Sequence, residues 1–417
     1  MSFDELKLSE ADIEIIDGDR GVNYPKQNEF YDIGYCLFLN AKNVTKDGFD
    51  FNEKSFISRE KDNLLRKGKL VRNDIVLTTR GTVGNVAFYN NRVPFNNIRI
   101  NSGMVILRAK QSEYLPEFVY WMFRSNYIQD QINALKTGSA QPQLPITIMR
   151  TIKVLKPKLC EQKAIAATLS VLDDMIELNN QINKTLEDMA QAIFKSWFVD
   201  FEPFKDGEFE DSELGLIPKG WRVGTIGSLC SNIFSGGTPL TSEPKYWNGI
   251  YPWLSSGETR RPIIIKTEKS ITDEGIINSS TRLAKKYDIV IASAGQGHTR
   301  GQTAITLIDT YINQSVIALS SQAFGYLFCN LKNRYDELRA ISDSSSIRGS
   351  LTTKILNRFP IILPPKEVLL EFQRIFEVII EYCGQLAFQN EKLSEIRDTL
   401  LPKLMTGEIR VPVEEVI

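Results

Sequence analysis

The sequence predicts an α+β fold in which two strand-rich mixed α/β domains are separated by a long antiparallel two-helix coiled coil with a pseudo-twofold axis. Three observations support this prediction. The chain of 417 residues repeats itself at a separation of 207 residues, and each repeat ends in a long segment whose apolar residues have heptad spacing. Each half also contains short β-rich runs joined by glycine-containing turns.

The 207-residue repeat is clearest where each predicted domain ends and its helix begins, and it holds there without a gap. Solenoid repeats have units of roughly 20–50 residues, so a longer period predicts a duplicated domain with a duplicated helix. Two similar modules on one chain suit a ligand that has two parts. The matched positions include Leu144 with Leu351, Ile152 with Phe359, Pro157 with Pro364, Asn183 with Asn390, Leu186 with Leu393 and Ile193 with Leu400.

Composition limits the classes of protein. The net charge is −1, so any contact with DNA has to come from local patches or from a partner. The five cysteines have no C-x-x-C spacing, which favours a reducing compartment over a zinc site or a disulfide framework. The N-terminus lacks an apolar signal core, and no apolar run approaches the ~20 residues of a bilayer span. We therefore expect a cytoplasmic protein without membrane contact.

The length predicts two or three domains. We place the first domain at residues 1–150, a central helix at 151–206, the second domain at 207–358, and a second helix with a tail at 359–417. Inside the domains the offset drifts: strands at 74–79 and 288–293 match 214 residues apart, and 100–107 matches 312–319 at 212. Fixed strands with drifting offsets indicate loops of unequal length, which is how binding specificity diversifies on a shared scaffold.

The two helices are predicted from their seams. The segment from Cys160 to Phe198 contains no proline or glycine and would be ~58 Å long at ~1.5 Å per residue. The second helix begins near Lys366, and we expect Pro402 to end it. Neither helix can bury its stripe alone, so we expect antiparallel packing; whether Asn183 meets Asn390 or solvent is open. The predicted seam includes Ile165, Leu169, Leu172, Ile176, Asn179, Asn183, Leu186 and Ile193, and Phe372, Phe376, Ile379, Asn390, Leu393 and Leu400.

Polar loops supply candidate contacts to DNA, because base edges are read by Arg, Lys, Asn and Gln with support from Ser and Thr. Ordinary polar turns have a similar composition. In the first domain the candidates are Arg80, Thr82, Asn85, Asn97, Arg99, Lys136, Ser139, Gln141 and Gln143. In the second domain they are Thr238, Lys245, Gln296, His298, Thr299, Arg300, Ser346 and Arg348.

The sequence argues against catalysis by this chain. A DNA amino-methyltransferase holds its flipped base with an Asp/Asn-Pro-Pro-aromatic loop, and residues 363–366 lack the acid or amide. No G-x-x-x-x-G-K-[ST] segment occurs, and His298 is the only histidine. Asp173 and Asp174 are expected to be solvated helix surface rather than a metal site. We therefore expect no catalytic residue, no metal and no cofactor in this chain.

Four local segments, in this order along the chain, resemble the specificity subunit of type I restriction–modification systems, and the resemblance covers essentially the whole chain. The first domain departs from the pattern, because it lacks the Ile-Pro-x-x-Trp opening and its residues 13–18 mirror residues 226–236 only loosely. The segments are Thr-Gly-Ser-Ala-Gln-Pro-Gln-Leu at 137–144, Phe-Lys-Ser-Trp-Phe-Val-Asp-Phe at 194–201, Leu-Gly-Leu-Ile-Pro-Lys-Gly-Trp at 214–221 and Ser-Gly-Gly-Thr-Pro at 235–239.

The resemblance implies a non-catalytic reader of a bipartite, asymmetric target in double-stranded DNA, with two methyltransferase subunits docked on the helix pair. S-adenosylmethionine would then bind to those partners, and ATP and Mg would serve a motor and nuclease subunit. Three rival hypotheses stay open: the recognition subunit of a related bipartite-site type II system, a DNA-independent coiled-coil scaffold with two binding domains, and a self-contained methyltransferase–endonuclease.

Overall fold

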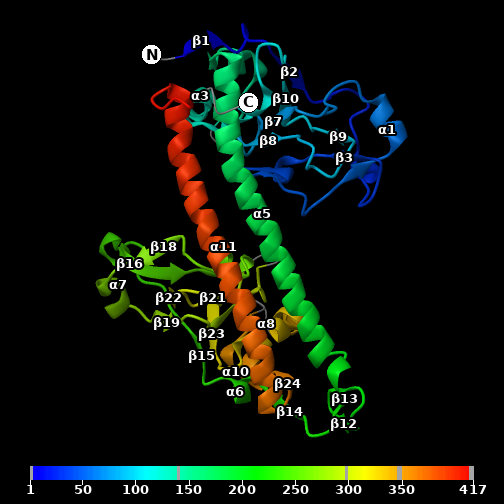
Figure 1. Cartoon of the computed structure of the whole chain (residues 1–417), viewed down its shortest axis with the longest axis vertical. Helices are drawn as coiled ribbons and strands as arrows, with labels where there is room; N and C mark the ends of the chain where they lie inside the picture. Colours follow the sequence, from blue (N-terminus) through cyan, green and yellow to red (C-terminus); the bar gives the residue numbers. More distant parts are fainter. Residues whose placement is uncertain (1–2, 139–140, 296–298, 345–349, 413–417) are drawn as a thin grey trace. The chain divides into compact units, whose positions relative to one another are not determined.

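The computed structural model describes residues 3–138, 141–295, 299–344 and 350–412, and the chain forms two compact units (Figure 1). Unit 1 comprises Met1–Met175 and Lys392–Ile417, and unit 2 comprises Ile176–Glu391. Each unit contains one strand-rich domain and a part of each of two long helices, α5 (Leu159–Phe198) and α11 (Lys366–Thr406). Within the described ranges, no helix is both long and apolar enough to span a membrane.

The domain of unit 1 is built on two small sheets. Its strands are β1 (Asp4–Lys7), β2 (Ile13–Asp17), β3 (Cys36–Phe38), β4 (Val44–Thr45), β5 (Gly48–Phe49), β6 (Phe56–Ile57), β7 (Ile75–Thr78), β8 (Val86–Phe88), β9 (Ile98–Arg99), β10 (Met104–Ala109) and β11 (Lys153–Lys156). The larger sheet is antiparallel with the order β2-β10-β7-β8, and the smaller has the order β6-β3-β9. β1 pairs with β11, so the two ends of the domain meet just before α5 begins.

The helices of this domain are α1 (Arg59–Leu64), α2 (Pro116–Arg124), α3 (Asn126–Leu135) and α4 (Ile146–Met149). α1 lies at the smaller sheet, while α2, α3 and α4 contribute to the core of the larger sheet. α2 begins at Pro116, whose missing N–H costs nothing in the first helical turn, and it buries Phe118, Trp121 and Phe123. Both long helices contribute to the same core through Ile165, Leu169, Leu401, Leu404 and Met405.

Unit 2 has the same central arrangement of strands and helices, with differences at its edges. Its strands are β12 (Phe209–Ser212), β13 (Gly215–Pro218), β14 (Arg222–Thr225), β15 (Asn232–Ser235), β16 (Trp247–Leu254), β17 (Ile263–Ile264), β18 (Lys269–Ile271), β19 (Arg282–Ala284), β20 (Ile289–Ala292), β21 (Thr303–Thr306), β22 (Thr310–Ile312), β23 (Val316–Ser320) and β24 (Pro360–Leu363). The sheets have the orders β15-β23-β20-β21-β17 and β18-β16-β22-β19, and β14 pairs with β24. Its helices are α6 (Ile226–Leu229), α7 (Asp273–Ile277), α8 (Phe324–Asn333), α9 (Tyr335–Ser344) and α10 (Thr353–Arg358).

Strand register makes the two units equivalent residue by residue. Asp17 of β2 lies opposite Val105 of β10 in unit 1, and Ser235 of β15 lies opposite Ile317 of β23 in unit 2. β3 pairs in parallel with β9, as β16 does with β22. Strands β12, β13, β17 and β19 of unit 2 have no counterpart strand in unit 1, and β4 and β5 of unit 1 have none in unit 2. The duplicated scaffold with altered connections, predicted from the drifting offsets, is confirmed.

The two long helices are antiparallel within each unit. In unit 1, Asp173 of α5 pairs with Arg397 of α11 at 2.5 Å, and Glu161 pairs with Arg410 beyond the end of α11 at 2.6 Å. In unit 2, Asn179 of α5 bonds to Asn390. Residues later in α5 therefore pair with residues earlier in α11. This is the antiparallel arrangement predicted from two seams that cannot be buried alone.

Two details of the helices correct the expectation. α11 does not end at Pro402 but continues to Thr406, because Leu404 and Met405 are buried in the core of unit 1 and this burial outweighs one missing hydrogen bond. The seam also shifts by one residue where a helix packs on its own domain as well as on its partner. The more buried member of each adjacent pair is Phe194 rather than Ile193, Ile380 rather than Ile379, and Leu401 rather than Leu400.

The two seam asparagines, Asn183 and Asn390, do not bond to each other and differ in their hydrogen-bond partners. Asn390 Oδ1 accepts a hydrogen bond from Asn179 Nδ2 at 2.8 Å, and its own Nδ2 donates to Asn180 Oδ1 at 2.9 Å. Asn179 also donates to Gln389 Oε1 at 3.2 Å. The buried Oδ1 of Asn183 has no hydrogen-bond partner among the described residues. Asn183 and Asn390 are equivalent in sequence but not in bonding.

Candidate nucleic-acid interface

Unit 1 has a hollowed polar surface at the end of β2. Two hollows of about 280 and 450 Å³ both include Asp17 and Arg20 in their lining. Gln143 also lines the first hollow, so residues from the start and from the end of the domain meet there. Four cations line the two hollows, and we call them the basic rim: Arg20, Arg66, Lys67 and Arg80.

The loop after β2 is shaped by close backbone packing. A Cβ on Gly18 would lie 2.2 Å from the carbonyl oxygen of Asn101, so only glycine fits there. Asp19 accepts hydrogen bonds from the backbone N–H groups of Gly21 and Arg66, both at 2.7 Å. Burial alone would raise the pKa of Asp19, but these N–H donors lower it. One carboxylate therefore holds the loop after β2 against the segment that carries Arg66 and Lys67.

The rim cations differ in how firmly they are held. Arg20 uses Nη2 to bind Asp17 Oδ1 and the carbonyl oxygen of Ser102, both at 3.2 Å, and its side chain is 49% exposed. Arg66, Lys67 and Arg80 are exposed, and their side chains have no hydrogen bond or ion pair with the part of the chain that the structure describes. The surface therefore presents one oriented arginine and three cations available to a ligand.

The predicted DNA contacts of the first domain fall into three groups. Arg80 and Gln143 form an isolated β-bridge and line the same hollow. Thr82, Lys136 and Gln141 are exposed and line neither hollow. Asn85 is tied into the domain by its side chain, because its Nδ2 donates to the Val44 carbonyl at 2.9 Å. Asn97 is half-buried and is bonded through its backbone, where its carbonyl accepts from the Leu37 N–H at 2.9 Å. Ser139 lies outside the described residues.

Arg99 is a correction. It is 5% exposed, its Nε donates to Asp62 Oδ1 at 2.5 Å, and its Nη groups donate to the carbonyl oxygens of Asp62, Leu65 and Lys67. Burial would raise the pKa of Asp62, but hydrogen bonds from Lys69 and Arg99 lower it. Arg99 thus holds α1 to the smaller sheet from the inside. An arginine in a buried ion pair and an arginine on a DNA-reading surface are the same residue type, so the sequence alone could not distinguish the two roles.

The second domain places its candidates differently. Thr238 Oγ1 donates to Gln314 Oε1 at 2.5 Å, and exposed Lys245 pairs with Glu274 at 3.1 Å, which raises the pKa of Lys245. Arg300 pairs with Asp343 at 2.9 Å. The candidates outside the described residues are Gln296, His298, Ser346 and Arg348.

Thr299 is the second correction. It is 3% exposed, and its Oγ1 accepts hydrogen bonds from Nε and Nη2 of Arg260 at 3.1 and 2.8 Å. Thr299 therefore supports the exposed Arg260, which is not among the predicted DNA contacts.

Register shows which residues were missed and why. Arg20 occupies the position of Thr238, three residues beyond the equivalent pair Asp17 and Ser235. Arg66 and Lys67 occupy the positions of Ser280 and Thr281, three and two residues before the bridge of Lys69 to Arg99 and its equivalent, Leu283 with Tyr311. The available signal was the match of Gly18 with Gly236, which carries Thr238 directly onto Arg20.

Comparison with known proteins decides the family. The model of the type I restriction modification DNA specificity domain matches residues 14–188 and 218–397, which is more than half of the chain and one match per repeat. The chain belongs to this family.

Relatives within the specificity family extend over most of the chain. The MjaIX specificity subunit of Methanocaldococcus jannaschii is 28% identical over 376 residues, covering 86% of this chain and 84% of the relative. The HindI specificity subunit of Haemophilus influenzae is 24% identical, covering 94% and 98%. The S subunit structure from M. genitalium is similar in fold, with a TM-score of 0.59 at 18% identity, covering 97% of this chain and 96% of that one.

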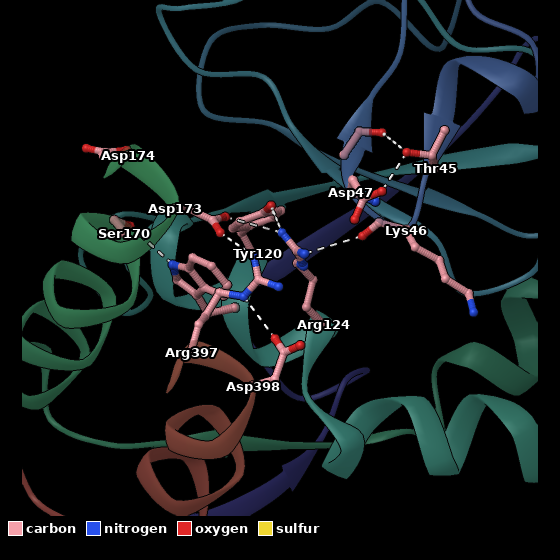
Figure 2. Close-up of polar contacts among 12 residues, drawn as sticks. Thr45, Lys46, Asp47, Tyr120, Arg124, Ser170, Asp173, Asp174, Arg397 and Asp398 are labelled. Atoms are coloured by element: carbon pink, nitrogen blue, oxygen red, sulfur yellow. Dashed lines mark hydrogen bonds and ion pairs between the residues drawn. The ribbon is translucent and has the colours of Figure 1, made fainter. Parts of the chain in front are cut away.

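In this specificity-family chain, charged contacts join the domain of unit 1 to the long helices in addition to the shared apolar core. Asp173 of α5 pairs with Arg397 at 2.5 Å and with Arg124 of α2 at 3.4 Å, and Arg124 also donates to the hydroxyl of Tyr120 and to the Lys46 carbonyl (Figure 2). Burial would lower the pKa of Arg397, but hydrogen bonds to its acidic neighbours raise it. Asp173 is therefore a bridging residue and not the solvated surface expected from sequence.

The helices of the specificity-family chain also carry exposed apolar residues at positions related by the 207-residue repeat. Surface leucines and valines are common singly, but matched pairs on both repeats indicate a duplicated feature. The matched exposed pairs are Val171 with Val378, Met175 with Tyr382, and Met189 with Ile396.

Proposed function

We propose that this chain is the DNA-reading subunit of a type I restriction–modification complex and that each unit reads one half of a bipartite, asymmetric target in double-stranded DNA. The observation that carries the proposal is one strand framework with two surface chemistries. Register-equivalent positions hold Arg20, Arg66 and Lys67 in unit 1 but Thr238, Ser280 and Thr281 in unit 2. Two readers of the same build with different side chains recognise two different half-sites.

The matched apolar positions on α5 and α11 support docking of two copies of one partner. Val378 is 73% exposed and its counterpart Val171 is 56% exposed, values that are unfavourable for a helix face that stays in water. Because the positions recur once per repeat, a partner that binds one set can bind the other. The partner we propose is the methyltransferase subunit, with a motor and nuclease subunit joining for restriction.

The chemistry belongs to the partners in this proposal. S-adenosylmethionine and the methyl transfer to adenine are assigned to the methyltransferase subunit, and ATP and Mg to the motor subunit. No group of three or more metal-ligating side chains gathers within the ranges that the structure describes. Methyl transfer to DNA should require both proteins: activity of the purified chain alone would contradict the assignment.

Methylome sequencing tests the function directly. A host that expresses the chain with its cognate methyltransferase subunit should gain methylated adenines in one gapped motif with two unlike halves. The host expressing the methyltransferase alone is the control. If no new bipartite motif appears although the two proteins co-purify, the chain is not a DNA reader; a gapped motif formed without any motor subunit in the locus favours the type II alternative.

The helix pair offers a second test. α5 and α11 have 40 and 41 residues, and four residues inserted into each at facing positions lengthen the pair by ~6 Å. At ~3.4 Å per base pair the unspecified spacer should grow by about two base pairs while both half-sites stay the same. Insertion into only one helix breaks the seam and serves as the control. A changed half-site in the double insertion would refute the helix pair as the determinant of spacing.

A further inference from the structure

We propose that Arg20 is the residue with which unit 1 reads a guanine in its half-site, and that Arg66 and Lys67 bind the phosphates beside it. The inference rests on the proposed DNA-reading function and assigns roles within it. It is drawn from the two hollows at the end of β2, which Arg20 and Asp17 line together.

Arg20 is oriented before any ligand arrives. Asp17 and the Ser102 carbonyl both bind Nη2, so the two hydrogens on this nitrogen are used. Nε and Nη1 keep three N–H donors that have no acceptor among the described residues. A fork to the N7 and O6 acceptors of guanine pairs Nη2 with Nε or Nη1, so on binding the base replaces the Ser102 carbonyl at Nη2 while Asp17 keeps the guanidinium oriented. An arginine held in place loses less side-chain entropy on binding than a free one. These features suit base reading.

The loop that carries Arg20 is held by backbone packing and hydrogen bonds on both sides of Arg20. Gly18 packs against the Asn101 carbonyl at its start, and Asp19 bonds to the N–H groups of Gly21 and Arg66. Val22 at its outer edge is 98% exposed, which makes an apolar group available for a thymine methyl. The loop therefore projects a short set of side chains from a rigid base.

Arg66 and Lys67 have the opposite character. Both are exposed, and neither side chain is held by another described residue, so they can follow the phosphate backbone without a fixed geometry. Phosphate contacts carry affinity and salt dependence but no sequence information. Because Asp19 links the Arg66 backbone to the Arg20 loop, a phosphate bound at Arg66 or Lys67 would set the position of Arg20 over the base edge.

The two roles predict different phenotypes in the complex with the methyltransferase subunit. Arg20→Ala should relax one base pair of one half-site, with discrimination there falling roughly 5- to 150-fold, and leave the other half-site unchanged. Lys67→Ala should keep the motif, weaken binding to every sequence alike and reduce the slope of log K against log salt by about 0.9. Methylome sequencing and binding to a randomised duplex library over a salt series measure both.

Lys110→Ala is the matched control. Lys110 follows β10, whose last residue Ala109 lies opposite Ile13, so it sits at the other end of the strand pair from Asp17. It is 67% exposed, and among the described residues its side chain pairs with Asp12 alone, at 3.5 Å, so its removal should change neither motif nor salt slope.

Three outcomes decide the proposal. A motif relaxed at one base pair in Arg20→Ala supports it. An unchanged motif with normal methylation overturns it and leaves the DNA-reading function intact. If Arg20→Ala weakens binding uniformly, as Lys67→Ala should, Arg20 contacts phosphate and the reading role is wrong. Arg20→Gln separates misfolding from lost recognition, because it keeps a polar side chain, and its melting temperature should match that of the wild type. Failure of the wild-type complex to yield a gapped motif would instead reject the function itself.

Discussion

The two units attach equivalent domains to the same helix pair by different physical means. In unit 2 the contact is aromatic: Phe372 of α11 lies 5.0 Å from Phe198 and 6.1 Å from Trp197 of α5 between ring centroids, and Phe198 lies 4.8 Å from Tyr326 of α8 in the domain. In unit 1 the positions 207 residues away hold Ile165, Met405 and Leu404, and a charged bridge at Asp173 lies further along α5. Since the helices follow the same course in both units, backbone geometry is the constrained feature and side-chain chemistry is free to vary.

The reading surfaces differ in the same manner. Unit 1 presents the basic rim, whereas the positions of Arg20, Arg80 and Lys67 in unit 2 are Thr238, Ala294 and Thr281. Loops after fixed strands can change charge without a cost to the core, while the buried helix contacts exchange one apolar side chain for another. The comparison predicts large stability effects at the helices and smaller ones at single polar positions.

The largest effect is expected at the aromatic contact. Phe372→Ala removes a 1% exposed ring that packs on four other aromatic rings, and we expect a loss of about 3–5 kcal/mol in the stability of unit 2. The equivalent Ile165→Ala in unit 1 should cost about 2–4 kcal/mol. Urea unfolding followed by hydrogen exchange separates the units. Equal losses would mean that the aromatic packing adds nothing beyond burial.

The sequence predicted the strands and helices, which follow periodic patterns, but not the roles of polar residues that depend on burial. The 207-residue echo predicted the domain order, the strands around 75–78 and 289–292, and the antiparallel helices, because heptads and strand runs are periodic. Arg99 and Thr299 were predicted to be surface contacts, because the residue type alone does not show that Asp62 and Arg260 bind them within the fold. Arg20 is absent from the predicted contacts because the start of the first domain mirrors residues 226–236 only loosely in sequence.

The ionic bridge of unit 1 should come next in magnitude. Asp173→Ala leaves Arg397, which is 13% exposed, with only Asp398 as a carboxylate partner, and we expect a loss of about 2–3 kcal/mol, reduced from a fully buried pair because Asp173 is partly solvated. The matched change in unit 2 is Glu187→Ala, which breaks the pair with the more exposed Lys332 and should cost about 1 kcal/mol or less. The measurement is unfolding at low and high salt. A loss at Asp173 that disappears in high salt would show that the bridge is solvated.

The two seam asparagines should respond with opposite signs. Asn183→Leu replaces a buried, unpaired Oδ1 with an apolar group, and we expect unit 2 to gain about 1 kcal/mol. Asn390→Leu removes the donor to Asn180 and one of the two acceptors of Asn179, which keeps Gln389, and we expect a loss of about 1–2 kcal/mol. Thermal melts of both variants decide the matter. Gains in both variants would mean that the asparagine cluster contributes no stability.

The smallest effect is expected at a pair of equivalent aspartates, and it depends on pH. Asp74 Oδ2 accepts from the Val71 N–H at 2.8 Å, and Asp288 Oδ2 accepts from the Lys285 N–H at 3.0 Å. Asp74 is also bound by Nε and Nη2 of Arg108, both at 2.8 Å. The position of Arg108 in unit 2 is Ser320, so Asp288 is buried without an arginine and burial raises its pKa.

A raised pKa means that the folded state prefers the protonated carboxyl. The contribution of Asp288 to stability is therefore present below the pKa of the unfolded chain and is lost as the pH rises through the folded-state pKa. Asp288→Asn keeps an oxygen for the Lys285 N–H and removes the buried charge, so unit 2 should become slightly more stable at neutral pH and its stability should vary less with pH. Asp74→Asn should instead destabilise unit 1 at neutral pH, because Arg108 loses its carboxylate. Urea unfolding at pH 5 and pH 7.5 tests both, and a loss of stability in Asp288→Asn at neutral pH would show that the Asp288 carboxylate is stabilised by its N–H and hydroxyl donors rather than penalised by burial.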